Sequence, residues 1–170
     1  MNITDIAGLM VEVLLEGIDV NQDVFDDDRK NIDYKEDQYS KSYQFRRQIM
    51  DKRVEVFLEI ATYEKRCYVH FKVNGYYVKK KSSNYDVLLA LKVMGYVVSC
   101  MRSIKNIHDD ISVFEFTADK EHEQQYDKLL PRLSNKLGFT YEKFAWNSNR
   151  TMQDKIQKNV ILSASYEIYM

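Results

Sequence analysis

The sequence predicts a single α+β domain, residues 1–170, with a mixed, mainly antiparallel central sheet that is flanked by helices. Two segments in which apolar and polar residues alternate, 52–61 and 66–73, indicate strands with one buried face. A long and almost wholly apolar segment, 83–101, and an amphipathic segment, 120–137, predict two helices. With 170 residues, 45% of them hydrophobic, the chain can enclose one core.

The N-terminal part of the chain divides into an apolar-striped segment and an acidic segment. Residues 3–16 repeat apolar side chains at helical spacing and predict a helix that Gly17 can end. Residues 19–38 contain eight acidic and three basic side chains, which predicts an acidic surface loop with room for a helical turn. The loop is too short to be a linker between domains.

Three strands are predicted next. Residues 43–49 and 52–61 look like a hairpin, because the second segment places an apolar side chain at every other position. Residues 66–73 repeat this period of two. The dipeptide Asn74-Gly75 that follows is a strong turn signal.

The middle of the chain is its most apolar part. Residues 83–101 predict a helix that is buried around most of its circumference, because apolar residues occupy nearly every helical position. Gly95 within it permits close packing and does not indicate a break. Residues 110–118 are apolar at nearly every position, as in a central strand that is covered on both faces.

The last third of the chain predicts one helix and two strands. Residues 120–137 carry a single apolar stripe, and Gly138 follows where a helix commonly ends in a left-handed residue. Residues 139–146 predict a strand that leads into a polar connection. Residues 159–169 alternate apolar with smaller or polar side chains and predict the final strand.

Four short motifs mark where these elements begin or end. They are a Tyr-x-Phe hairpin start, a strand that closes on alanine, a Tyr-Asp-x-Leu helix and a Lys-Leu-Gly-Phe helix end, at Tyr43–Phe45, Phe114–Ala118, Tyr126–Leu129 and Lys136–Phe139. The order helix, three strands, helix, strand, helix, two strands resembles that of the GNAT acetyltransferases over nearly the whole chain. Together with the motifs, it resembles more narrowly the small GNAT-like proteins of tailed bacteriophages. The resemblance implies a GNAT-like topology.

The resemblance implies coenzyme A chemistry only where the cofactor contacts are present, and two of them are missing. The family cradles the cofactor phosphates with glycines before the long helix, because glycines expose backbone N–H groups there. This chain has no glycine pattern at that place, and the candidate phosphate contacts, if coenzyme A binds, are Lys79, Lys80, Lys81 and Ser83. The family also implies a tyrosine shortly before Gly138, where Ser134 stands and the nearest tyrosine is Tyr126. We therefore predict no cofactor and no catalytic residue.

A metal site is not predicted either. Residues 19–23 begin like a calcium-binding EF-hand loop, but Val24 stands where glycine is required and Lys30 where the bidentate glutamate belongs. The histidines and cysteines stand at no zinc-ligand spacing: His70, His108, His122, Cys67 and Cys100. We interpret the histidines as surface residues and the cysteines as small core residues.

Large aromatic residues exceed what one small core needs, which indicates a contact surface. The predicted interaction surface consists of Tyr68, Tyr76, Tyr77 and Trp146. The three tyrosines, together with Tyr85, interleave with lysines at positions 72, 79, 80 and 81, and such a strip also suits single-stranded nucleic acid. We do not favour nucleic acid, because no recognised nucleic-acid motif accompanies the strip and the net charge of the chain is −1.

The function that these observations predict is that of a non-catalytic bacteriophage protein acting through protein–protein contacts, as a virion component or a host-binding factor. Its expected location is the virion or the host cytoplasm. An acyl-CoA-dependent N-acetyltransferase with an atypical phosphate loop and a nucleic-acid-binding accessory protein are the alternatives. No apolar run approaches the roughly 20 residues that span a bilayer, so we expect no membrane contact.

Overall fold

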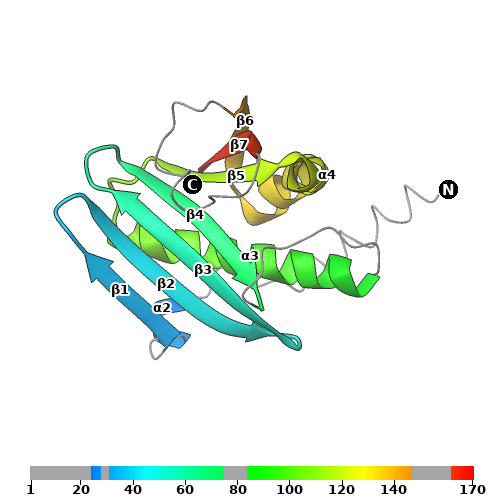
Figure 1. Cartoon of the computed structure of the whole chain (residues 1–170), viewed down its shortest axis with the longest axis horizontal. Coiled ribbons are helices and arrows are strands. Elements are labelled where there is room, and N and C mark those ends of the chain that lie inside the picture. The colour runs from blue at the N-terminus through cyan, green and yellow to red at the C-terminus, as the bar shows by residue number, and fades with distance from the viewer. Residues whose placement is uncertain (1–23, 28–30, 75–83, 147–161) are drawn as a thin grey trace.

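The computed structural model describes residues 24–27, 31–74, 84–146 and 162–170, which form one sheet and the helices that pack against it (Figure 1). In chain order the elements are α2 (Val24–Asp27), β1 (Ile32–Glu36), β2 (Ser40–Ile49), β3 (Lys52–Ala61), β4 (Arg66–Val73), α3 (Asn84–Ile107), β5 (Val113–Asp119), α4 (Lys120–Leu137), β6 (Thr140–Ala145) and β7 (Leu162–Tyr169). The predicted helix at 3–16 lies outside the described residues.

The described strands form one sheet in the order β1-β2-β3-β4-β5-β7-β6. Neighbouring strands are antiparallel except β4 and β5, which are parallel. Parallel neighbours need a crossover connection, and the crossover includes α3. The predicted mixed, mainly antiparallel sheet is therefore confirmed, as is the order of elements from β2 to β7.

The two long helices pack against the same face of the sheet, which we call the inner face. Helix α3 contacts β2 and β3, and α4 contacts β5, β6 and β7. Tyr126 of α4 lies edge-on to Phe116 of β5 and Tyr166 of β7, with ring centroids 4.9 and 5.5 Å away. Phe116 has the same strand phase as Phe114, which pairs with Cys67 on the face that α3 covers. The opposite face, which we call the outer face, has no helix against it in the described residues.

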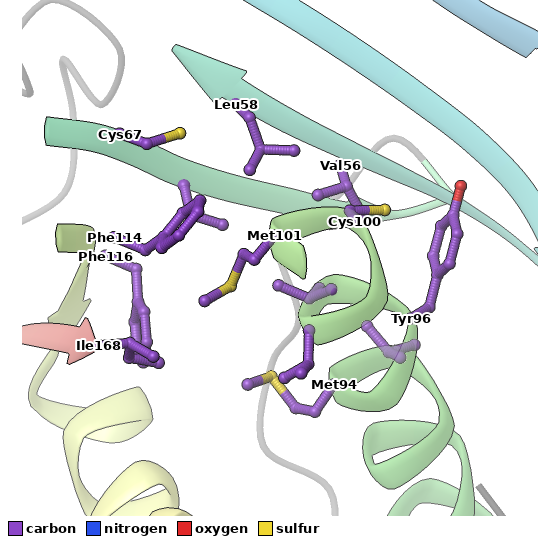
Figure 2. Packing of buried hydrophobic residues seen from close by; sticks show 14 of the residues in the cluster. Val56, Leu58, Cys67, Met94, Tyr96, Cys100, Met101, Phe114, Phe116 and Ile168 are labelled. Atoms are coloured by element: carbon purple, nitrogen blue, oxygen red, sulfur yellow. The ribbon is translucent and has the colours of Figure 1, made fainter. Parts of the chain in front are cut away.

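The core lies between the inner face and the two helices. Figure 2 shows Val56, Leu58 and Cys67 of the sheet and Met101 of α3 directed into a common interior with Phe114. Helix α3 is buried on nearly all sides between residues 91 and 104, with only Lys92 exposed and Arg102 half-buried. The prediction of a largely buried helix is confirmed.

Two boundaries depart from the sequence prediction for physical reasons. Helix α3 continues to Ile107 and not only to Met101, because Ile104 is fully buried and the hydroxyl of Ser103 accepts a hydrogen bond from the backbone of Val24. The helix end is held by Lys105, whose ammonium donates to the backbone carbonyls of residues 109 and 111. Strand β5 spans Val113–Asp119, slightly later than predicted.

The prediction of a surface loop at residues 19–38 is wrong for its second half. Residues 32–36 form the edge strand β1, which pairs with β2. Ile32, Tyr34 and Glu36 share the inner phase of the strand, and only the first two are apolar. The alternation of apolar and polar residues was therefore too short to recognise in the sequence. Val24 is also fully buried, in the short helix α2.

Both ends of α4 lie where the sequence predicts them, and each end is capped. Asp119 caps the first turn by accepting a 2.8 Å hydrogen bond from the backbone N–H of His122. Gly138 adopts φ 72°, and its N–H donates to the carbonyl of Ser134. Neither α3 nor α4, the long helices of the described part, has a stretch apolar enough to cross a membrane.

Replacing Met101 by alanine tests this core. Met101 is 1% exposed, so its truncation leaves a cavity, and we expect the free energy of unfolding to fall by about 2–5 kcal/mol in urea denaturation. Lys92→Ala, on an exposed position of the same helix, is the control and should change stability by less than about 0.5 kcal/mol. Equal effects of the two substitutions would contradict the burial of α3.

Candidate binding site on the outer face of the sheet

The outer face carries two rows of side chains that strand pairing places side by side. One row runs from Asp33 through Gln44 and Phe57 to His70. The next row runs through Lys35, Ser42, Glu59 and Tyr68. Aromatic and charged residues therefore meet on β3 and β4, although this is the polar phase of both strands.

These rows line a hollow of about 350 Å³. The residues that line it include the rings of Phe57, Tyr68 and His70 and the charged groups of Asp33 and Lys72. A volume of this size is at the lower end of what small-molecule or side-chain pockets occupy in proteins. The hollow is the candidate functional site of the described chain.

The hollow lies where β4 and β5 separate. The two strands pair only at Arg66–Tyr68 and Val113–Glu115. Beyond these residues both continue, β4 to Val73 and β5 to Asp119, and Figure 1 shows them running apart. Thr117 of β5 lines the hollow together with residues of β4, so the opening between the strands is part of the site.

His70 is a half-buried neutral imidazole in the lining of the hollow. Burial lowers its pKa to about 4, and the positive charge of Lys72 adds to the effect. Its ring lies 5.5 Å from the ring of Phe57, measured between centroids. The prediction that His70 lies beside Tyr68 and Lys72 on the polar face is correct, but its burial was not foreseen.

The rings of the hollow already take part in polar contacts. The ammonium of Lys72 lies 5.1 Å from the centroid of the Phe57 ring, within the range of a cation–π contact. The hydroxyl of Tyr68 donates a 2.8 Å hydrogen bond to Glu64. Burial and this hydrogen bond raise the pKa of Tyr68, so the phenol is neutral at physiological pH.

A buried ion cluster lies beside the hollow at the point where β4 and β5 pair. Arg66 donates to Glu115 at 2.6 Å and to Glu167 at 2.7 Å, and both carboxylates are almost fully buried. Tyr169 also donates to Glu167. The cluster joins β4, β5 and β7 on the outer face.

The predicted site residues are distributed unevenly. Tyr68 lines the hollow. Trp146 follows β6, where its backbone N–H donates to the carbonyl of Ser163, and it does not line the hollow. The other predicted residues lie outside the described part of the chain: Tyr76, Tyr77, Lys79, Lys80, Lys81 and Ser83.

Sequence reasoning missed Glu59 and Thr117, whereas it counted Phe57 among the large aromatic residues that exceed the needs of the core. The signal was present for Phe57, because a phenylalanine on the polar phase of a strand is an exposed apolar group without a core to join. Nothing in the sequence indicated that Thr117 would face β4, since that depends on where the strands separate.

The remaining candidates for acid–base or metal chemistry, a tyrosine and two histidines, lie outside the hollow. Tyr126, the nearest tyrosine before Gly138, is 7% exposed on the inner face, and burial raises its pKa. His108 bonds to the hydroxyl of Tyr43 at 2.8 Å, and His122 bonds to Asp119. No group of three potential metal ligands occurs among the described residues.

Comparisons with protein-family models, with curated proteins and with solved structures find no match to this chain. The geometry of the outer face is therefore the basis for interpreting the site. Its distinguishing feature is a hollow with aromatic walls at the separation of two parallel strands.

Arg66→Met tests the ion cluster. Removing the cation leaves two buried carboxylates without their shared partner, and we expect the free energy of unfolding to fall by about 3 kcal/mol at pH 7. Arg53→Met is the control, because Arg53 is a surface arginine paired with Glu55, and it should cost less than about 1 kcal/mol. Urea denaturation at constant salt measures both, and similar losses would argue against the cluster.

His70 makes the stability of the folded chain depend on pH. Its pKa is about 4 in the folded chain and near 6.5 when unfolded, so the unfolded chain binds more protons between these values. The stabilisation is complete above pH 6.5 and is lost as the pH falls towards 4. Between pH 7 and 4.5 we expect the wild type to lose on the order of 2 kcal/mol more than His70→Gln. Equal losses in urea denaturation at the two pH values would contradict the burial of this imidazole.

Proposed function

We propose that this chain is a non-catalytic, GNAT-like bacteriophage protein that binds a protein partner on the outer face of its sheet. The observation that carries the proposal is the hollow lined by Phe57, Tyr68 and His70, on a face that no described helix covers. Aromatic side chains around a pocket are typical anchors of protein interfaces. The setting, as a virion component or a host-binding factor in the virion or the host cytoplasm, rests on the motif resemblance alone.

The element order supports the GNAT-like part of the proposal. From β2 to β7 the chain has three strands, a helix, a strand, a helix and two strands, as the resemblance implies. The side chains of the four motifs contribute Tyr43, Phe116, Tyr126 and Leu137 to the core, and Gly138 ends α4. These motifs therefore act on the fold and carry no information about catalysis.

The side chains around the hollow support a binding role over an acid–base role. His70 is a weak base with a pKa of about 4. Glu115 is held by Arg66. Tyr126 is buried on the other face of the sheet, away from the hollow.

One observation favours the acyltransferase alternative. The separation of β4 and β5 beyond Tyr68 and Glu115 opens the sheet where an acyl thioester would enter in the family that the chain resembles. The candidate phosphate contacts before α3 lie outside the described residues. A thioester in this opening would meet Thr117 and the neutral ring of His70.

The nucleic-acid alternative is less compatible with the hollow. Asp33 and Glu59 line it together with Tyr68, and carboxylates repel a phosphate backbone. Lys35 and Lys72 balance these charges without producing a basic field. A single-stranded oligonucleotide would therefore have to bind elsewhere on the chain.

Phe57→Lys tests the partner-binding proposal. Placing a charge in the aromatic wall should abolish capture of a specific protein from phage-infected host extract, because the hollow is the proposed contact. Tyr63→Lys is the matched control, since Tyr63 is 82% exposed in a turn away from the hollow, and it should capture the same protein as the wild type. Quantitative mass spectrometry compares the three samples, and equal capture by both variants would refute the assigned surface.

Titration calorimetry of the full chain with coenzyme A and acetyl-CoA separates the two leading functions. We expect no heat of binding from either compound. Saturable binding of acetyl-CoA, with loss of affinity when Thr117 is replaced by tryptophan to fill the opening, would replace the non-catalytic proposal by the acyltransferase.

A further inference from the structure

The carboxylate of Glu59 has no partner among the described side chains, although it is half-buried in the hollow. It makes no hydrogen bond and no ion pair with any residue that the structure describes. Two of the other charged groups that line the hollow, Asp33 and Lys72, do have partners. Asp33 binds Arg46 at 2.6 Å, and Lys72 lies over the Phe57 ring.

Glu59 is flanked by rings and a small hydroxyl. Tyr68 lies directly across from it on β4, and Ser42 lies across from it on β2. Phe57 is the preceding outward residue on the same strand. A carboxylate with two aromatic neighbours suits a cation, because aromatic rings and a carboxylate both attract positive charge.

An arginine side chain fits this arrangement better than an ammonium group. A guanidinium is planar, stacks on aromatic rings and donates two parallel hydrogen bonds to one carboxylate. The hollow of about 350 Å³ has room for the whole side chain. The Phe57 ring accepts a cation already, since it lies 5.1 Å from the ammonium of Lys72.

We propose that the hollow is a pocket for an arginine side chain of the protein partner, held by Glu59 between Phe57 and Tyr68. The proposal rests on the proposed function, because it names the group by which the partner is recognised. Lys72 then acts as a competing cation, which the incoming guanidinium displaces from the ring.

The test uses N-acetyl-arginine amide as the probe and follows backbone amide signals of the full chain by NMR. We expect saturable shifts at Ser42, Phe57, Glu59 and Tyr68. Glu59→Gln should weaken the binding about tenfold. Lys72→Ala should strengthen it several-fold, because it removes the competing charge.

Glu142→Gln, on an exposed position of β6, is the matched control and should leave the affinity unchanged. Three results would overturn the proposal: shifts that do not saturate, an affinity that Glu59→Gln does not change, or preferential binding of N-acetyl-glutamate amide. If the wild type does not bind the probe but still captures the protein partner, the arginine pocket is refuted and the proposed function stands. If the wild type binds acetyl-CoA tightly and also binds the probe, the proposed function is refuted and the pocket stands.

Discussion

The described sheet has two parts, and they are joined by a short parallel pairing of β4 with β5 that involves three residues of each strand. Strands β1 to β4 form one antiparallel part, and β5, β7 and β6 form the other. They join only where Arg66–Tyr68 pairs with Val113–Glu115. So short a ladder of hydrogen bonds is weak, and two further contacts reinforce it. On the inner face, buried residues of both parts belong to one hydrophobic core. On the outer face, Arg66 of one part holds Glu115 and Glu167 of the other.

The same short ladder produces the hollow. Because β5 follows β7 after Glu115, it leaves β4 and opens the sheet beside Val69 and Thr117.

The sequence was a good guide where periodicity and end signals agree. Residues 66–73 and 120–137 begin and end as predicted, because alternation defines the first segment, and an apolar stripe followed by Gly138 defines the second. The burial of α3 also followed from its composition. These are local signals, and each depends on a few adjacent side chains.

What the sequence did not reveal depends on contacts between distant segments. Strand β1 has only two apolar residues on its inward phase, so its pairing with β2 left almost no alternation to recognise. The continuation of α3 past Met101 depends on the contact of Ser103 with α2. Of the candidate site, Tyr68 was predicted, whereas Glu59 and Thr117 were not, because their approach depends on strand register and on the separation of β4 from β5.

The charged margins of the sheet have a consequence for assembly. The outermost strands are β1 and β6, and both expose charges, with Asp33, Lys35 and Glu36 on one and Glu142 and Lys143 on the other. A second copy that added a strand at either margin would have to desolvate these groups, which discourages edge-to-edge polymerisation. Growth along the hydrogen-bonding direction is thereby resisted at high protein concentration.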